Sequence, residues 1–267
     1  MRRLLGAVAA VATLALAAGC GGSGDDTSSG SGSGSSPSAS SGGVSGTVTV
    51  FAAASLTETF TTLGTQFEAA HPGTTVRFNF GASSALAESI NQGAPADVFA
   101  SASPKNMQQV VDGGGASDSK TFADNVMQIA VPPDNPGNVS QLSDLTRSGL
   151  KVALCQPQVP CGTVAAQVFR NAKITVKPVT EGADVKAVLT AVQLGEVDAG
   201  VVYKTDVQAA GTKVKGIEIP ADQNASTSYP IAALAKAPNS AGAAAFVDYV
   251  LSDDGEKVLS QAGFTAP

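Results

Sequence analysis

Two short segments of the sequence combine a strand-like run, small residues and a serine at the point where a helix should begin. The first is the segment 51–56 (FAAASL) and the second is the segment 80–87 (FGASSALA). The first turn of a helix exposes backbone N–H groups without an intrahelical partner and carries a partial positive charge. Small residues let an anion approach this backbone closely, and the hydroxyl groups of Ser55 and Ser83 add further donors.

Each of these serines also has a simpler interpretation, in which it only caps its helix. Serine is among the preferred N-cap residues, so either segment alone would favour capping. Two such segments in consecutive strand–helix units instead favour a common anion site, since open α/β sheets bind ligands where strands end and helices begin. The sequence therefore predicts an anion-binding pocket that contains Ser55 and Ser83.

The same sequence argues against an enzyme. His71 is the only histidine and precedes a proline that should end a helix, which suits an exposed helix-end residue better than a general base. The chain has no G-x-S-x-G nucleophile elbow, no P-loop and no dinucleotide-binding fingerprint. We therefore expect a binding protein without a catalytic site or a cofactor, and without a metal site beyond its ligand. A lipid-anchored surface enzyme or an adhesion module is the alternative from another class.

The serine segments must be positioned by a fold in which strands and helices alternate. Apolar or β-branched runs between turns predict strands, and apolar residues at helical spacing predict helices. The predicted strands are 47–51, 75–80, 98–100, 126–131, 150–154 and 199–203. The predicted helices are 55–70, 162–171, 184–194 and 253–261, with two more that begin near Ser83 and Pro104. This alternation is typical of an α/β fold with largely parallel sheets.

Further motifs extend the argument over most of the chain. They are the segments 93–99 (GAPADVF), 160–162 (PCG), 181–185 (EGADV), 200–203 (GVVY) and 263–265 (GFT). With the serine segments, and in the same order, they resemble the molybdate-binding proteins of ABC importers from about residue 47 to the end. The resemblance implies a two-lobed α/β fold of the periplasmic-binding-protein type II kind. Each lobe should have a mixed, mostly parallel sheet flanked by helices, with the ligand in the cleft between the lobes.

The resemblance also implies lobe boundaries and ligand contacts. The first lobe should comprise residues 47–127 and 222–267, and the second should comprise residues 128–221. Five groups should donate hydrogen bonds to molybdate, two from the first lobe and three from the second: the hydroxyls of Ser55 and Ser83, the backbone N–H groups of Cys161 and Val185, and the hydroxyl of Tyr203. The family often has Pro-Ala-Gly where this chain has PCG, an exchange that a backbone donor tolerates.

These donors define a class of anion. None of them is a carboxylate, and the site motifs contain no lysine or arginine. A phosphate that keeps a proton at neutral pH needs an acceptor, whereas a fully ionised oxyanion needs only donors. Asp184 is expected to cap a helix, and Asp97 is expected to lie in a turn before a buried strand. The donors therefore favour a fully ionised tetrahedral oxyanion. The resemblance implies that this anion is molybdate, with tungstate beside it, and a receptor for sulfate or another tetrahedral oxyanion is the alternative.

The beginning of the chain has the pattern of an export signal. Arg2 and Arg3 precede an uncharged apolar run that is shorter than the roughly 20 residues of a membrane-spanning helix. Small residues directly before Cys20 resemble a bacterial lipobox. We therefore expect a signal peptide at 1–19, a lipid on Cys20 and a disordered Ser/Gly linker at 20–46, which together place the protein on the outer face of the cell membrane. An ordinary cleaved signal is the alternative.

The remaining cysteines, Cys155 and Cys161, are close in sequence. Outside the membrane disulfides persist, and closing so short a loop would contribute about 2 kcal/mol on the chain-entropy estimate. A zinc site is disfavoured because the spacing does not suit it and no second Cys/His pair exists. A disulfide here would stiffen the loop that presents the Cys161 N–H group.

The net charge of −6 limits the possible partners. It argues against nucleic acid, whose binding depends on basic residues. It does not exclude an anion, because the global field is screened beyond about 8 Å at physiological salt and local donors decide affinity. The expected partners are a small oxyanion, the permease of an ABC transporter and, through the anchor, the membrane. The protein itself is expected to be a monomer.

Overall fold

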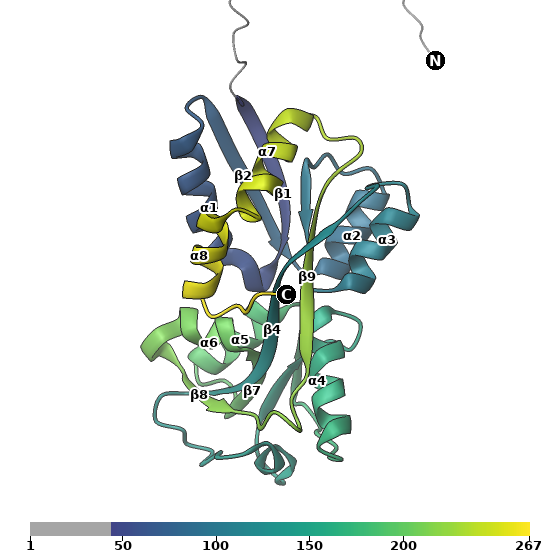
Figure 1. Cartoon of the computed structure of the whole chain (residues 1–267). Helices are drawn as coiled ribbons and strands as arrows, with labels where there is room; N and C mark the ends of the chain where they lie inside the picture. Colours follow the sequence, from purple (N-terminus) through teal and green to yellow (C-terminus); the bar gives the residue numbers. More distant parts are fainter. Residues whose placement is uncertain (1–43) are drawn as a thin grey trace, which may run out of the picture. The chain divides into compact units, whose positions relative to one another are not determined.

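Strands and helices alternate along the chain (Figure 1). The structure is a computed structural model and describes residues 44–267. Its strands are β1 Gly46–Ala53, β2 Thr74–Gly81, β3 Val98–Ala100, β4 Lys120–Val131, β5 Val152–Cys155, β6 Thr180–Gly182, β7 Ala199–Tyr203, β8 Lys215–Glu218 and β9 Ser226–Ala233.

The helices begin directly after strands at several places. They are α1 Thr57–Ala70, α2 Ser83–Asn91, α3 Pro104–Asp112, α4 Pro160–Asn171, α5 Val185–Gln193, α6 Lys204–Ala210, α7 Ser240–Val250 and α8 Asp253–Gln261. Three 3-10 helices accompany them: η1 Ala54–Leu56, η2 Leu142–Thr146 and η3 Gly211–Lys213. The helix predicted at 55–70 therefore starts as η1 and continues as α1.

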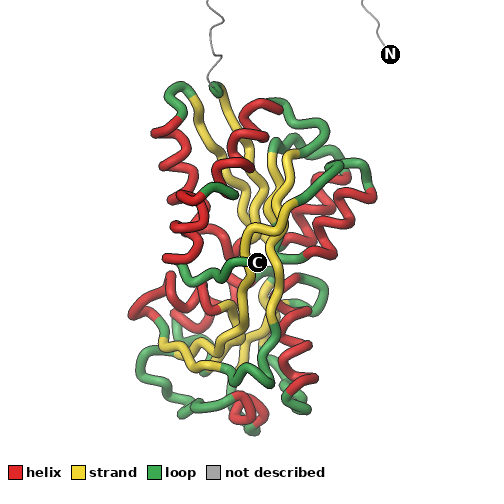
Figure 2. The backbone as a smooth tube through the Cα atoms, viewed as in Figure 1, coloured by secondary structure: helices red, strands yellow, loops and turns green. Residues whose placement is uncertain are grey.

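The strands form two groups that share β4. The order in the first group is β2-β1-β3-β9-β4, while in the second group β4 pairs with β7 and β8, and β5 and β6 follow β7. The pairs of β1 with β2 and β3, and of β5 with β6 and β7, are parallel. The pairs that involve β4 or β9 are antiparallel. Helices flank these strands (Figure 2), which confirms the mixed α/β fold.

The buried side chains divide in the same way as the strands. The cores around β1, β3 and β9 come from residues 48–123 and 229–264. The core around β5 and β7 comes from residues 127–219, with Ala54 added from the start of η1. Since apolar burial is the main stabilising contribution in folding, each group of strands is held by a core of its own. The structure is therefore two-lobed.

Two segments pass between the lobes, β4 and the connection from β8 to β9 (Figure 2). β4 pairs with β9 as far as Val126 and with β7 from Met127 onward. At this point the Asn224 amide accepts a hydrogen bond from the Met127 N–H group (3.2 Å) and donates one to the Met127 carbonyl (2.9 Å). A side chain thus takes the place of a strand partner where β4 changes neighbours.

Two elements of the first lobe, β9 and α7, were not predicted from the sequence. β9 contains Pro230, and proline argues against a central strand because it donates no ladder hydrogen bond. The structure accommodates it where the register of β4 shifts between Thr121 and Ala123, opposite Pro230. β4 is also longer than the predicted strand 126–131, because its polar first half lacks the apolar pattern of a buried strand.

The predicted signal peptide at 1–19 and the lipidated Cys20 lie outside the described residues, as does nearly all of the linker at 20–46. Within residues 44–267, none of the helices is long and apolar enough to cross a membrane.

Candidate functional site

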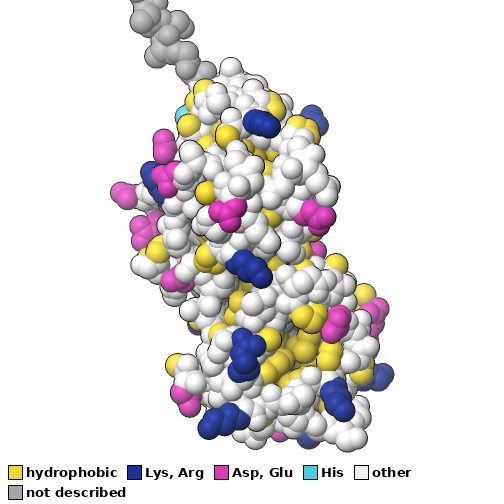
Figure 3. Space-filling model, turned by 90° about the vertical axis from the view of Figure 1, so that its right-hand side faces the viewer, with side chains coloured by type: hydrophobic (Ala, Val, Ile, Leu, Met, Phe, Trp, Pro, Cys, Tyr) yellow, Lys and Arg dark blue, Asp and Glu magenta, His cyan; other side chains and the backbone are white. Residues whose placement is uncertain are grey.

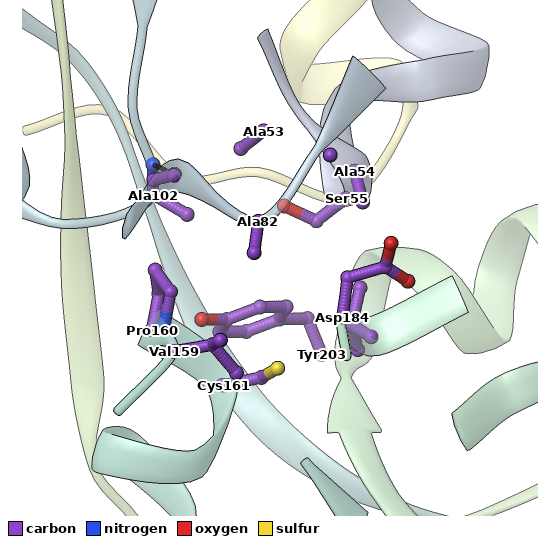
Figure 4. Close-up of a pocket in the computed structure, with 13 residues that line it drawn as sticks. Ala53, Ala54, Ser55, Ala82, Ala102, Val159, Pro160, Cys161, Asp184 and Tyr203 are labelled. Carbon is purple, nitrogen blue, oxygen red and sulfur yellow. Dashed lines mark hydrogen bonds between the residues drawn. The ribbon is translucent and has the colours of Figure 1, made fainter. Parts of the chain in front are cut away.

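One small pocket is lined by all five residues that the sequence singles out as anion donors: Ser55, Ser83, Cys161, Val185 and Tyr203. The first two come from the first lobe and the other three from the second (Figure 4). The pocket has a volume of about 20 Å³, taken as the space open to the centre of a water-sized sphere. This is slightly more than one water molecule requires, so the pocket suits a ligand of a few atoms.

Four helix beginnings meet at this pocket. Ser55 lies in η1, which leads into α1, Ser83 is the first residue of α2, and Val185 is the first residue of α5. Cys161 lies in the first turn of α4. The first intrahelical donors are Leu86 in α2 and Thr163 in α4. The backbone N–H groups of Ser83 and Cys161 therefore have no partner within their own helices, and these groups are where a helix attracts an anion.

The alternative interpretation of the two serines, in which each only caps its helix, is wrong. The N-cap residue of α2 is Ala82, and neither α2 nor η1 has a side-chain cap. The Ser83 hydroxyl oxygen instead accepts a hydrogen bond from the Ala102 N–H group at 2.9 Å, and the Ser55 hydroxyl contacts the Tyr229 hydroxyl at 2.9 Å. Both serines are buried. Their hydroxyls are therefore held by neighbouring segments at the pocket rather than by their own helices.

Tyr203 lies across the pocket from Ser55 and Ala82 (Figure 4). Its side chain is only 1% exposed, and among the described residues its hydroxyl has no hydrogen-bond partner. A buried donor without a partner costs about 1–3 kcal/mol, so it requires an explanation. Burial, and then Tyr229 and Asp206, raise the pKa of Tyr203 well above its ordinary value. The hydroxyl therefore stays protonated at neutral pH and can donate to a ligand.

The loop that presents Cys161 is closed by a disulfide between Cys155 and Cys161. Cys155 ends β5, so the bond joins this strand to the first turn of α4. Gly162 holds the loop from the other side, since a Cβ atom there would lie 2.0 Å from the Gln156 carbonyl oxygen. The glycine of the PCG motif is thus required by a close approach of two backbone segments.

The pocket lining is almost free of charge. Asp184 lines it, but its carboxylate caps α5 by accepting a hydrogen bond from the Ala187 N–H group at 3.0 Å, as predicted. In Figure 4 this carboxylate points away from the space between Ser55 and Tyr203. Asp97 accepts backbone hydrogen bonds from two other segments, which supports the structural role predicted for it.

Basic side chains are also missing from the lining, as far as the described residues go. On the face that Figure 3 draws, lysine and arginine side chains are spread over both halves and not gathered at one place. Within residues 44–267, no group of three or more His, Cys, Asp and Glu side chains could hold a metal ion. His71 is the C-cap residue of α1 and does not line the pocket. What the pocket offers a ligand is therefore a set of neutral donors.

Two residues near the pocket were missed at the level of sequence. Tyr229 is fully buried on β9, and its ring packs against that of Tyr203 with the centroids 6.1 Å apart. Asn125 on β4 donates hydrogen bonds to Thr205 at 2.8 Å and to Tyr229 at 3.4 Å. No motif marks either residue, and the proline after Tyr229 hides its strand.

Comparisons with known proteins identify the family of the chain. The family described as bacterial extracellular solute-binding protein matches residues 48–265. The molybdate-binding protein ModA of Mycobacterium tuberculosis is 41% identical over 221 residues, which cover 82% of this chain and 85% of the relative. The putative ABC transporter substrate-binding lipoprotein YvgL of Bacillus subtilis is 34% identical, covering 82% of this chain and 86% of the relative.

Solved structures share the fold. The periplasmic molybdate-binding protein of Azotobacter vinelandii superimposes with a TM-score of 0.74 at 21% identity, covering 82% of this chain and 99% of that one. The sulfate-binding protein SubI of Mycobacterium tuberculosis does so with a TM-score of 0.72 at 20% identity, covering 82% and 86%. At these identities the similarity shows the fold alone. With the sequence relatives, it confirms the resemblance that the motifs indicate.

Proposed function

Since the chain belongs to the family of bacterial extracellular solute-binding proteins, we propose that it captures molybdate outside the membrane and delivers it to an ABC importer. The observation that carries this proposal is the convergence of five neutral donors, from both lobes, on one small pocket. Binding and release, not catalysis, are the chemistry that such a pocket supports. Molybdate, or tungstate in its place, is then the transported ligand and not a cofactor.

The proposed contacts follow from the geometry. The hydroxyls of Ser55, Ser83 and Tyr203 and the backbone N–H groups of Cys161 and Val185 would donate to the oxygens of the anion. Fixed dipoles of this kind are preorganised and need little desolvation, so they can hold an anion without a salt bridge. A tetrahedral oxyanion without protons makes full use of such a site, because it offers only acceptors.

The two lobes are proposed to close on the ligand by a hinge motion. Residues 47–127 and 222–267 would form one lobe and residues 128–221 the other. The separate cores support this division, although Met127 and Ala54 pack in the core of the second lobe. The hinge would then lie where β4 and the connection to β9 cross between the lobes, beside the contact of Asn224 with Met127.

The pattern of residues 1–46 supports a proposal for where in the cell the protein acts. We propose that residues 1–19 are removed as a signal peptide, that Cys20 carries a lipid, and that residues 20–46 link this anchor to the binding lobes on the outer face of the membrane. The relative from Bacillus subtilis is named as a lipoprotein, which supports the anchor. The partner would be the permease of the transporter, and the protein would act as a monomer.

Calorimetric titration of the purified protein with molybdate, tungstate, sulfate and phosphate tests the proposal. We expect tight binding of molybdate and tungstate, weaker binding of sulfate and the weakest binding of phosphate. Absence of heat with all four anions would refute the proposed function. Tighter binding of sulfate than of molybdate would favour the second candidate, a sulfate receptor, for which the fold shared with SubI is the supporting observation.

A further inference from the structure

The contact between Ser55 and Tyr229 leaves one question of chemistry open, namely which hydroxyl donates. The two oxygens are 2.9 Å apart, both groups are buried, and either atom could be the donor. If Ser55 donated to Tyr229, its oxygen would face the pocket as an acceptor. If Tyr229 donated to Ser55, the Ser55 O–H group would be available to donate a hydrogen bond to a ligand in the pocket. The direction of this one hydrogen bond decides whether the pocket accepts or donates at Ser55.

The side chain of Asn125 determines that direction. Its Oδ1 atom accepts a hydrogen bond from the Val126 N–H group at 3.0 Å, which identifies the other atom of the amide as Nδ2. Nδ2 can only donate, and it does so to the Thr205 hydroxyl at 2.8 Å and, more weakly, to the Tyr229 hydroxyl at 3.4 Å. The Tyr229 oxygen thus already accepts a hydrogen bond from Asn125, and its own O–H group is placed to donate to Ser55.

Tyr229 has little freedom to turn its ring away from this arrangement. It is fully buried and packs edge-on against Tyr203, Phe122 and Phe264, with ring centroids 5.3 to 6.2 Å apart. Burial raises the pKa of Tyr229 above its ordinary value, so it keeps its proton at neutral pH. The packing of the Tyr229 ring therefore holds its hydroxyl in place between Asn125, which donates to it, and Ser55, to which it donates.

Ser83 is oriented in the same sense by simpler means. The Ala102 N–H group donates to its hydroxyl oxygen at 2.9 Å. Since a backbone N–H group can only donate, the Ser83 oxygen is the acceptor in this bond, and the Ser83 O–H group remains to donate to another partner. Each serine of the first lobe thus accepts a hydrogen bond from a neighbouring group of the protein, and its own O–H group is left to donate at the pocket.

We infer that Tyr229 and Asn125 are positioning residues that hold the Ser55 hydroxyl as a donor toward the pocket and so strengthen the preference for oxyanions without a proton. This inference rests on the proposed function and assigns part of its selectivity to residues that do not line the pocket. A protonated anion such as hydrogen phosphate needs one acceptor. The Ser55 hydroxyl in η1, which could turn to offer one, is instead held in the opposite direction.

The test replaces Tyr229 by phenylalanine, which keeps the ring and removes the O–H group that donates a hydrogen bond to Ser55. Tyr249→Phe is the matched control, because the Tyr249 hydroxyl bonds Gln66 on an exposed part of the first lobe. Affinities for molybdate and hydrogen phosphate are measured by calorimetry at neutral pH. Tyr229→Phe should lower molybdate affinity roughly ten-fold and reduce the ratio of molybdate to phosphate affinity, whereas Tyr249→Phe should change neither.

A double-mutant cycle separates positioning from general damage. If Tyr229 acts through the Ser55 hydroxyl, Tyr229→Phe should have no effect on affinity or selectivity once Ser55 is alanine. Equal effects in both backgrounds, or unchanged selectivity in Tyr229→Phe alone, would overturn the inference. Should that variant fail to fold, Asn125→Ala enters the same cycle with the same expected coupling to Ser55. A wild-type protein that binds none of the anions would instead refute the proposed function.

Discussion

The donors around the pocket are neutral hydroxyl and backbone N–H groups, and the two serine hydroxyls are held by hydrogen-bonded neighbours. A lysine in their place would bring more charge, but its burial costs desolvation and the ordering of a flexible side chain. A neutral donor that is buried without a partner also has a cost in the ligand-free protein, and Tyr203 is the example. Its buried hydroxyl has no partner among the described residues, so ligand binding and the stability of the ligand-free protein place opposite demands on it.

Tyr203→Phe should therefore have effects of opposite sign. The anion loses a hydrogen bond to a charged acceptor, typically about 1.5–3 kcal/mol, so its affinity should fall about ten-fold or more. The ligand-free variant no longer buries an unpaired hydroxyl and should unfold at the same temperature as the wild type or a higher one. Calorimetric titration and thermal unfolding without ligand measure the two effects. Unchanged affinity would remove Tyr203 from the site.

The roles of single residues were predictable where a residue type must stand at a given chain position. Small residues at the ends of β1 and β2 allow a close approach to the backbone, and on this ground the sequence predicts a pocket at Ser55 and Ser83. The direction in which a serine hydroxyl turns was not predictable. It depends on Tyr229, which lies 174 residues from Ser55, and on Ala102, which lies 19 residues from Ser83. No local pattern contains such information.

Among the elements, the loop between β5 and α4 combines two constraints. The disulfide joins its ends, and Gly162 packs against Gln156 without room for a side chain. The loop presents the N–H group of Cys161. A rigid loop loses less conformational entropy when the anion binds, so less of the binding free energy is spent on ordering this donor. The spacing of the cysteines predicted the pairing, but not that the bond would connect the end of a strand to the first turn of a helix.

Removal of the disulfide by the double change Cys155→Ala and Cys161→Ala should lower both stability and affinity. The chain-entropy estimate for so short a loop is about 2 kcal/mol, which for a protein of this size lowers the unfolding temperature by roughly 5 °C. The Cys161 N–H group remains, so molybdate affinity should fall less than in Tyr203→Phe. Thermal unfolding and titration, repeated on reduced wild-type protein, check this. Unchanged values in both experiments would leave the disulfide without a role at the site.

Strand order across the lobes was the least predictable feature among the elements. β9 lies between β3 and β4 although it follows them late in the chain, and it contains a proline. A proline in a central strand is acceptable only where the register of the partner shifts, and that shift in β4 is a property of the folded pair. Helix α8, by contrast, has a serine N-cap followed by acidic residues and was predicted with its observed bounds.

For the two lobes together, an ion pair couples the helices that begin at the pocket. Lys186 in the first turn of α5 lies 2.7 Å from Glu58 in the first turn of α1 and 2.9 Å from Asp206 in α6. Glu58 belongs to the first lobe and the other two residues to the second. Burial lowers the pKa of Lys186, but the two carboxylates raise it more, so the ammonium group stays charged. The contact with Glu58 therefore links the lobes beside the proposed ligand.

Within the second lobe, Lys186 should contribute more to stability through its pair with the buried Asp206 than through Glu58. Asp206 is fully buried, and burial raises its pKa to about 6 although Lys186 and the Tyr203 N–H group act to lower it. The folded protein thus holds this proton more tightly than the unfolded chain does. From this group, the free energy of unfolding falls as the pH rises from about 4 to about 6. Without Lys186 the pKa would rise further, and the fall would extend to higher pH.

Lys186→Met should therefore destabilise the protein more at about pH 8, where Asp206 of the wild type is charged and paired with Lys186, than at about pH 5, where it is largely protonated. Loss of one partner from a buried pair costs about 3–5 kcal/mol, so the difference is measurable by denaturant unfolding at the two pH values. Glu58→Gln is the matched control, because it removes only the half-exposed partner in the first lobe and should change stability by less than about 1 kcal/mol. Equal losses at both pH values in Lys186→Met would show that Asp206 does not depend on Lys186 for its charge, and that the ion pair serves only to join the lobes.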